Sequence, residues 1–405
     1  MSNTTPALSA KYIDAPQNCT GCALCANVCS QGAISMVWNA EGFLIPQVNT
    51  NACINCGLCA KQCIALEAKP AYTDDIQSVL AWGGWHKNEK IHLQSSSGGI
   101  FTALAEETLM AGGCVFGVVW QDKYTAVFSK AETLVELNRM RGSKYTPAMP
   151  GKVYQAVRLE LNTGRRVLFS GTPCQVHALK KYLRKSYDNL LTIDIVCHGV
   201  PSHIILEKYV QEAEARTGKT IDHISFRDKP EGWLLYHVTC HYNDGSTTSV
   251  PLDKDLYMRL FLCDKALNLV CYNCPYAHIP RQGDITLGDY WGVQKNHPDW
   301  PIDRGISVVL ANTARGHQCL QQVSDKVTLC EEPFDKIYSG QPVVYVRPEK
   351  QVPKERDLLL AKLPFWSSEK LLQKLVNSVR LGPIYLKRNG TIHNLLRKCM
   401  RLISR

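Results

Sequence analysis

The sequence predicts a mixed α/β protein, in which a small cysteine-rich α+β module precedes a larger domain with a mostly parallel sheet. Two observations predict this class. Two cysteine-rich runs repeat with a 34-residue period near the N-terminus. Beyond them, apolar runs of strand length alternate with segments of helical period, which is the pattern of parallel β–α units. We expect a first domain over residues 1–70, a second over 76–345 and a basic helical tail over 346–405.

The two cysteine runs both have the spacing C-x2-C-x2-C-x3-C. Bacterial two-cluster ferredoxins use this spacing, and the fourth cysteine of each run binds the cluster of the other run. Ser30 and Ile64 stand where such runs usually carry proline. The spacing therefore predicts two 4Fe-4S clusters, one held by Cys19, Cys22, Cys25 and Cys63, the other by Cys53, Cys56, Cys59 and Cys29.

Zinc and disulfides are the alternatives for these cysteines. Zinc sites usually pair two C-x2-C units across a longer loop, which gives four ligands and not eight in two repeats. Disulfides need an oxidising compartment, and the N-terminal residues lack the basic and apolar segments of an export signal. Between the two runs, residues 33–48 alternate apolar and polar side chains, which predicts a β-hairpin.

The larger domain has strand and helix signals in alternation. Residues 99–113 have the helical period and end on two glycines. Two further helices are expected after short apolar strands, one over residues 171–183 and one from about residue 203. The expected strands are 114–120, 125–129, 165–170, 190–196, 223–227, 234–240, 284–292 and 305–312. This order predicts a mostly parallel sheet with some antiparallel additions.

Further cysteines lie where a cofactor could bind. Cys174 and Cys197 each come just after an apolar strand and just before a helix, and open α/β sheets bind ligands at the carboxyl ends of their strands. Cys271 and Cys274 form a separate C-x2-C pair, and Cys263 is another candidate for a fourth ligand. These residues predict a third 4Fe-4S cluster, with zinc or plain buried cysteines as alternatives.

Two further stretches could hold a phosphate or a flavin. Residues 95–101, SSSGGIF, form a serine- and glycine-rich turn that opens a helix. The N-terminus of a helix attracts anions, although such a turn can also be a plain helix cap. In RMRGSKYTP, Arg141 and Lys144 could pair with a phosphate or lie near a flavin, or belong to a solvated loop.

In order, SSSGG, RGSKY, GTPCQ, DIVCHGVPS, FRDKPEGW, CYNCPYA and DITLGDYWG resemble the beta subunit of coenzyme F420 hydrogenase and dehydrogenase. The resemblance spans residues 81–313, and the N-terminal module matches the ferredoxin fused to some members. It implies FAD, one 4Fe-4S cluster and hydride exchange with a soluble carrier. It assigns the third cluster to Cys174, Cys197, Cys271 and Cys274, and the flavin to Ser96, Ser97, Gly98, Gly99 and Lys144, with Arg141 nearby.

The resemblance implies an iron–sulfur flavoprotein oxidoreductase that relays electrons between clusters and a small molecule, either coenzyme F420 or another soluble substrate. Its electron donor or acceptor would be ferredoxin or another redox protein. Members of this kind also occur in bacteria without coenzyme F420, some alongside surface-polysaccharide synthesis. The rival hypothesis is a non-catalytic electron-transfer subunit that feeds a partner enzyme. Candidates for the substrate pocket are His198, Arg227, Lys229 and Trp233, each of which could equally have a structural role.

The charge of the chain is concentrated at one end. The net charge is +10, and residues 370–405 contain nine basic side chains and no acidic one. Residues 391–405 have an apolar helical face, so this tail could lie on an anionic membrane surface or dock on the body of the protein. Nucleic-acid binding is not expected, since Tyr385 is the one aromatic residue within the basic stretch 370–405. We expect a cytoplasmic protein that reaches the inner membrane, if at all, through this tail.

Overall fold

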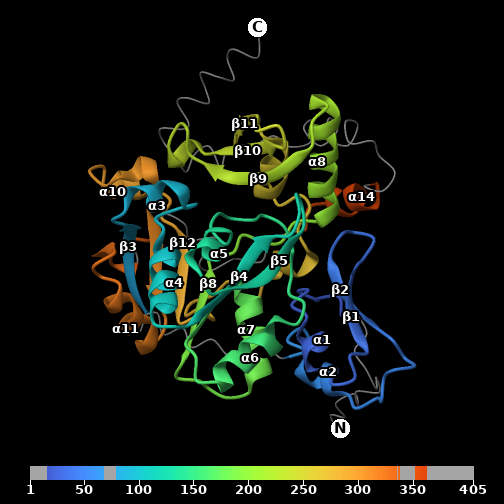
Figure 1. The fold of residues 1–405 in the computed structure, drawn as a ribbon. Helices are drawn as coiled ribbons and strands as arrows, with labels where there is room; N and C mark the ends of the chain where they lie inside the picture. The colour runs from blue at the N-terminus through green and yellow to red at the C-terminus, as the bar shows by residue number, and fades with distance from the viewer. Residues whose placement is uncertain (1–15, 68–78, 335, 338–351, 363–405) are drawn as a thin grey trace, which may run out of the picture.

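The computed structural model describes residues 16–67, 79–334, 336–337 and 352–362 (Figure 1). Within these residues the chain forms sheets of two, three and nine strands, together with helices. The expected mixed α/β class is confirmed. The residues between the first two expected domains, 71–75, and most of the basic tail lie outside the described residues, and the three expected domains stay a prediction.

The N-terminal module consists of two short helices and a hairpin. The hairpin strands pair antiparallel, with Ile34 opposite Val48 and Trp38 opposite Leu44, as the alternation in the sequence predicts. Each helix begins inside a cysteine run, directly after a residue in the left-handed conformation. The elements are α1 (Leu24–Val28), β1 (Ile34–Trp38), β2 (Leu44–Val48) and α2 (Leu58–Gln62).

The nine-stranded sheet is the centre of the larger domain. Its four middle strands, β12, β8, β7 and β4, run parallel, and antiparallel strands extend it on both sides. At the far end, β6 pairs parallel with β5. In spatial order the strands are β14 (Val327–Glu331), β3 (Leu80–His86), β13 (Ser307–Ala311), β12 (Ile285–Asp289), β8 (Leu190–Ile195), β7 (Val167–Gly171), β4 (Cys114–Trp120), β5 (Ala126–Ala131) and β6 (Ala148–Met149).

Helices cover both faces of this sheet, because its central strands are apolar on both sides. In β4, Val115 and Val119 enter one buried cluster with α4 and α11, whereas Cys114 and Phe116 enter another with α6 and α7. The helices of this domain are α3 (Glu89–Gln94), α4 (Ile100–Met110), α5 (Leu134–Asn138), α6 (Val153–Asn162), α7 (Pro173–Leu183), α10 (Val293–Asn296) and α11 (Ala314–Gln322).

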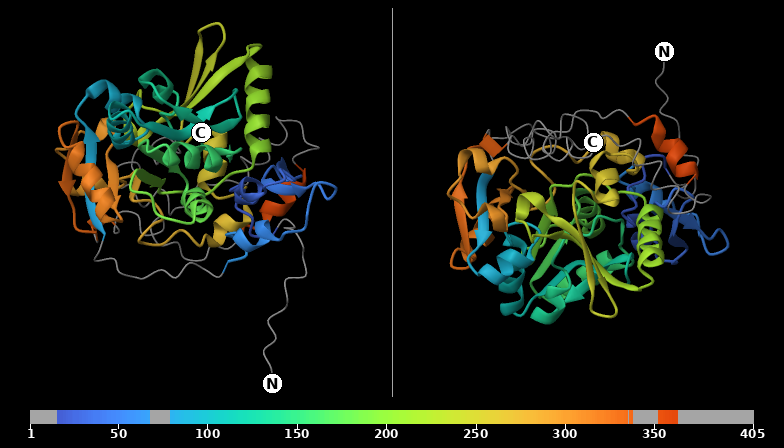
Figure 2. Two further views of the ribbon diagram at one scale, coloured as in Figure 1. Left: turned by 60° about the horizontal axis from the view of Figure 1, so that its bottom comes forward. Right: turned by 90° about the horizontal axis from the view of Figure 1, so that it is seen from above.

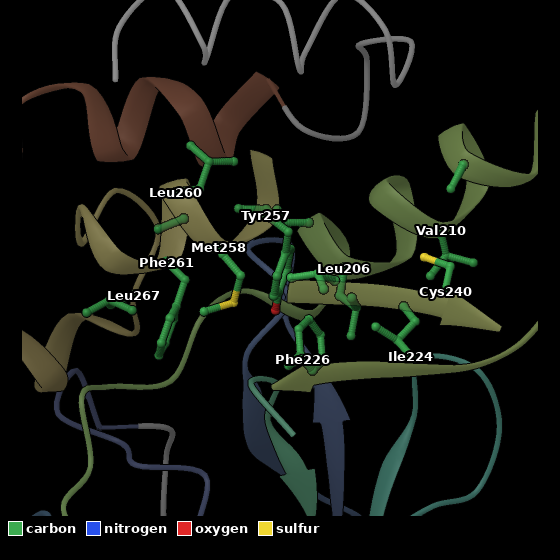
Figure 3. Close-up of a cluster of buried hydrophobic side chains, with 14 of the residues drawn as sticks. Leu206, Val210, Ile224, Phe226, Cys240, Tyr257, Met258, Leu260, Phe261 and Leu267 are labelled. Carbon is green, nitrogen blue, oxygen red and sulfur yellow. The ribbon is translucent and has the colours of Figure 1, made fainter. Parts of the chain in front are cut away.

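A second, three-stranded antiparallel sheet lies beside the large one (Figure 1). The sequence predicts its strands but not that they form a separate sheet. Helices α8 and α9 pack on it around Phe226, Tyr257 and Phe261 (Figure 3). This part contains α8 (His203–Thr217), β9 (Ile221–Asp228), η2 (Trp233–Leu235), β10 (His237–Tyr242), β11 (Thr247–Pro251), α9 (Leu256–Leu262), η3 (Leu269–Asn273), η4 (Ile302–Arg304) and α14 (Glu355–Lys362).

The N-terminal module packs against the side of the larger domain (Figure 2). Its hairpin turn meets the start of α8, where the His203 N–H donates to the Gly42 carbonyl at 3.0 Å and the Ser202 hydroxyl to the Glu41 carbonyl at 2.6 Å. The Trp38 and His203 rings stack, with their centroids 4.3 Å apart. The module is therefore held in a defined orientation and does not hang on its linker alone.

In the described part of the chain, no helix is long and apolar enough to cross a membrane. The amphipathic segment expected over residues 391–405 lies outside that part. Helix α14 is the described portion of the predicted tail, and it contributes Leu359 and Leu360 to the core around Tyr257.

The contact between hairpin and α8 predicts a specific sensitivity at Gly42. Its φ is +79°, and an added Cβ would lie 2.6 Å from Ser202 Oγ and 2.9 Å from Ile204 N. Gly32 has a similar φ of +62° but open space around it. Gly32→Ala should therefore lower the free energy of unfolding by about 1 kcal/mol through backbone strain alone, and Gly42→Ala by roughly 1–3 kcal/mol more. Urea denaturation of both variants tests this, and equal losses would contradict the packed contact.

Candidate functional site

The first N-terminal thiol set is brought together in the interior. Burial raises the pKa of Cys22 to about 12, and the nearby thiols of Cys19 and Cys63 add to the rise. The pKa of Cys25 is raised for the same reasons, by burial first and then by the other three thiols of the set. Cys63 from the second run thus joins the first run, as crossed ligation requires. Binding of a metal cluster would remove the protons from these thiols, because cysteine binds metal as the thiolate.

The second thiol set lies nearer the surface. Cys56 is exposed, whereas Cys59 is buried in a small cluster that Cys29 also contacts. The Asn55 N–H donates to Cys53 Sγ at 3.4 Å. Ile54, between these cysteines, has 63% of its surface exposed. The module therefore has one thiol set facing inward and one near solvent.

The third group of thiols surrounds a cavity at the carboxyl edge of the large sheet. Strands β7 and β8 are parallel neighbours, with Gly171 opposite Asp194, so the loops that follow them meet at one edge. The cavity has an empty volume of about 490 Å³, part of it open to solvent. Its lining includes Cys174, Cys197, Cys271 and Cys274, together with Thr20 and Arg281.

The four thiols of the cavity come from the three chain segments that the sequence singles out. Cys263, the competing candidate, is not among the lining residues. Across the described ranges, no three cysteine, histidine or acidic side chains meet at the spacing of a single metal ion. The four thiols line one cavity, and four is the number that a 4Fe-4S cubane needs, because each of its irons takes its own thiolate.

The cavity and the first thiol set adjoin each other. Burial raises the pKa of Cys174, and the thiols of Cys197, Cys274 and Cys22 add to the rise. Cys22, Cys174 and Cys274 pack against the same buried cluster, which includes Tyr154. The Tyr154 hydroxyl donates to the Cys22 carbonyl at 2.8 Å, and its own pKa is raised by burial and by the thiols on both sides.

The predicted flavin residues form a second convergence, where SSSGG meets RGSKY. Ser96 Oγ accepts hydrogen bonds from the Ser143 N–H at 2.8 Å and from its hydroxyl at 3.0 Å. The Ser97 hydroxyl donates to the Ile306 carbonyl at 2.9 Å, and the Gly98 N–H to Ser307 Oγ at 2.9 Å. Gly99 then begins α4 with a φ of +86° and without a side-chain cap.

Two basic residues near this turn have different surroundings. Lys144 donates to the carbonyls of Met140, Arg141 and Gly142 at 3.1–3.3 Å, and burial lowers its pKa to about 7. It therefore braces its own loop. Arg141 lies 3.6 Å from Glu106, but its Nε is buried without a hydrogen-bond partner.

His86 is a further polar group at this turn, which the sequence does not single out. It is 5% exposed, its Nδ1 accepts from the Asn88 N–H at 3.0 Å, and its Nε2 is buried without a partner. The backbone N–H of His86 donates to the Gly98 carbonyl at 2.7 Å, so His86 is bonded directly to the SSSGG turn. An uncapped start of α4 beside unsatisfied Arg141 and His86 nitrogens fits an anionic group such as a phosphate.

The candidates for the substrate pocket are engaged within the protein. Arg227 forms a two-pronged ion pair with Asp289 at 2.8 and 3.1 Å, and also donates to the Tyr145 hydroxyl at 3.0 Å. Lys229 donates to the carbonyls of His92, Ser97 and Arg304, and burial lowers its pKa to about 7.

His198 lies beside the cavity and pairs with another residue. Its Nε2 is 2.9 Å from Asp264 Oδ1 and 3.2 Å from the Phe261 carbonyl. Phe261 in turn contacts Tyr145, with ring centroids 4.9 Å apart. His198 and Phe261 therefore connect the cysteine cavity with the residues around Arg227. The catalytic roles of His198, Arg227 and Lys229 stay a prediction.

Asp289 is the most informative residue that the sequence does not single out. It ends β12, which is the parallel neighbour of β8, and so lies at the same sheet edge as Cys197. The Trp233 indole N–H donates to its Oδ1 at 3.2 Å. Its position in GDYWG, at the end of a strand, is a signal that could have identified it.

Three family models match the chain. Residues 18–65 match a 4Fe-4S dicluster domain. Residues 81–154 match the N-terminal model and residues 164–337 the C-terminal model of the coenzyme F420 hydrogenase/dehydrogenase beta subunit. The last two together cover more than half of the sequence. The chain belongs to the coenzyme F420 hydrogenase/dehydrogenase beta-subunit family.

This family and the dicluster domain make the chain an iron–sulfur protein with a redox, electron-transferring role. Among solved structures, it is similar to a chain of the xenon-derivatised F420-reducing NiFe hydrogenase complex from Methanosarcina barkeri. That match has 19% identity and a TM-score of 0.44, and covers 74% of this chain and 90% of that chain. No curated protein matches.

The Arg227–Asp289 pair predicts a large stability effect at Asp289. Asp289→Asn leaves the buried Arg227 guanidinium without its counter-charge, so the free energy of unfolding should fall by roughly 3–5 kcal/mol. Asp222 pairs with His223 at 2.9 Å on the surface, where its side chain is 69% exposed. Asp222→Asn should change stability by no more than about 0.5 kcal/mol. Urea denaturation compares the two, and a small effect of Asp289→Asn would mean that Arg227 finds another partner.

Proposed function

We propose that this protein is an iron–sulfur flavoprotein oxidoreductase that passes electrons between a redox protein and a soluble small molecule. The observation that carries the proposal is the four-cysteine cavity, which adjoins the inward thiol set on one side and the sheet edge with Asp289 on the other. When bound, 4Fe-4S clusters carry single electrons, and a flavin interconverts these with hydride.

In this proposal each thiol set holds one 4Fe-4S cluster. The first set is Cys19, Cys22, Cys25 and Cys63. The second is Cys53, Cys56, Cys59 and Cys29. The third is Cys174, Cys197, Cys271 and Cys274. The exposed position of Cys56 and Ile54 makes the second set the proposed contact for a redox partner, such as ferredoxin, because electron transfer requires close approach to a surface group.

The turn of Ser96, Ser97, Gly98 and Gly99 would bind the phosphates of FAD. It offers the uncapped start of α4, and Arg141 and His86 have unsatisfied nitrogens beside it. Lys229 and Ser143 support the turn from two sides, since Lys229 donates to the Ser97 carbonyl and Ser143 to Ser96 Oγ. In this role Lys144 and Lys229 position the flavin-binding loops and need not touch the flavin themselves.

The substrate would be coenzyme F420 or another soluble hydride carrier. Arg227 would act by orienting Tyr145 and Asp289 at the carboxyl edge of the sheet. His198 lies between the cavity and these aromatic residues and would face the substrate side of the proposed flavin. The protein would act in the cytoplasm, with contact to the inner membrane limited to the basic tail.

A second candidate function is a non-catalytic electron-transfer subunit that feeds a partner enzyme, for example in surface-polysaccharide synthesis. The engagement of Arg227 and Lys229 in internal contacts favours it, because neither cation is left open for a substrate carboxylate or phosphate. The two functions differ in turnover. The catalytic protein oxidises or reduces a carrier alone, whereas the subunit requires a stoichiometric partner for any reaction.

Metal and flavin content test the proposed function directly. Anaerobically purified protein should contain about twelve irons, about twelve sulfides and about one flavin per chain. Cys174→Ser should lower the iron content by about four, because it removes one ligand of the third cluster. Cys330→Ser, on the edge strand β14, is the matched control and should keep the full content. About eight irons in the unaltered protein would leave the N-terminal module alone as the metal-binding part.

The proposed flavin site predicts a strong effect at Gly98. A Cβ on Gly98 would lie 2.2 Å from the Gly84 carbonyl oxygen and 2.9 Å from Ser307 N, so Gly98→Ala must displace the turn. Flavin per chain should fall several-fold, whereas iron content stays unchanged. Gly112→Ala, just beyond the other end of α4, has open space and should retain its flavin. If Gly98→Ala also keeps its flavin, the turn is not the flavin site.

A further inference from the structure

Thr20 occupies the boundary between the first thiol set and the third. It belongs to the first cysteine run, between Cys19 and Cys22, yet its side chain lines the cavity of Cys174, Cys197, Cys271 and Cys274. The structure thus places one small residue against two groups of thiols that are more than 100 residues apart in the sequence. Ile54 holds the equivalent position in the second cysteine run, and it is exposed to solvent.

The backbone around Thr20 is fixed on both sides by the larger domain. Asn268 Nδ2 donates to the Cys19 carbonyl at 3.1 Å, and the Tyr154 hydroxyl donates to the Cys22 carbonyl at 2.8 Å. Asn268 is itself tied to the cavity, because its N–H donates to the carbonyl of Val200, a lining residue, at 2.8 Å. Thr20 therefore cannot move without disturbing contacts on either side of it.

The hydroxyl of Thr20 is buried and lacks a partner with good hydrogen-bond geometry. Thr20 stands within the first cysteine run and lines the cavity of the third thiol group. The sulfur atoms of a bound cluster carry negative charge and are good hydrogen-bond acceptors. Buried hydroxyls rarely lack a partner, so a sulfur atom of a cluster bound at this boundary is the acceptor that fits the Thr20 hydroxyl.

We propose that Thr20 is a positioning residue for electron transfer between the first and third cluster sites, with its hydroxyl donating to a sulfur atom of a bound cluster. This inference rests on the proposed function. A hydrogen bond to cluster-bound sulfur stabilises the more reduced, more negative state, and so raises the reduction potential. One electron crosses this boundary at a time, so that the first site is oxidised by one electron as the third is reduced by one. No bond is broken and no proton is transferred.

Thr20→Val and Thr20→Ser separate the hydroxyl from the shape of the side chain. Valine keeps the shape and removes the donor, whereas serine keeps the donor and removes a methyl group. Iron and flavin content are measured first, and then the reduction potentials of the clusters by a redox titration followed by electron paramagnetic resonance. Thr20→Val should lower one potential, with about a tenfold smaller equilibrium constant for reduction, or about 59 mV for one electron. Thr20→Ser should match the unaltered protein.

Each outcome decides the inference. Unchanged potentials in Thr20→Val with full iron content overturn it and leave the proposed function intact. An equal fall in both variants also overturns it, since packing and not the hydroxyl would then be responsible. If the unaltered protein lacks the third cluster by iron content, the proposed function fails and this inference fails with it. If Thr20→Val loses iron, the decision rests on Thr20→Ser. Full iron content and unchanged potentials in Thr20→Ser support the role of the hydroxyl, whereas a shifted potential in Thr20→Ser overturns the inference.

Discussion

The packing of the Cys19–Cys22 loop against the larger domain is the constraint on which the rest of the structure depends. This short loop supplies ligands to one predicted cluster and a wall to the cavity of another. It can do both only because Tyr154 and Asn268, from separate segments, hold its carbonyls. The hairpin contact with α8 sets the orientation of the same module from its other end. A ferredoxin-like unit on a free linker could not keep two thiol groups in contact, because a flexible chain samples many orientations.

The second organising feature is the concentration of buried positive charge at the carboxyl edge of the large sheet. Arg227 is neutralised by Asp289, but Lys144 and Lys229 are surrounded by carbonyl oxygens and their pKa values fall to about 7. Burying cations is unfavourable unless they gain polar partners. The carbonyl oxygens satisfy the hydrogen bonds of both lysines, but a pKa of about 7 leaves each side chain only partly charged at neutral pH. An anion such as a flavin phosphate bound nearby would favour the charged form of both.

Much of this organisation follows from local sequence patterns. The cysteine spacing predicts the module, the alternation over residues 33–48 predicts the β1–β2 hairpin, and two strand–cysteine–helix segments place Cys174 and Cys197 at one edge. What the sequence does not reveal is pairing over long distances. Nothing local shows that β9, β10 and β11 form their own sheet, or that Arg227 meets Asp289, 62 residues away. The resemblance assigns Lys144 to the flavin, but the sequence does not show that the short loop around it brings three carbonyls within hydrogen-bond reach.

The three thiol sets differ in their exposure to solvent, and this difference orders them along the proposed electron path. The second set lies near solvent at Cys56, the first is buried against the larger domain, and the third lines the cavity at the carboxyl edge of the large sheet. Fusing the ferredoxin-like module to the larger domain makes the inner contact intramolecular, so its effective concentration no longer depends on encounter between two proteins. Only the exposed second thiol set then needs a partner protein. The amide and apolar surface around Asn55 and Ile54 suits a transient contact with such a partner. The fold thus separates a fixed internal junction at Thr20 from an exchangeable one at the surface.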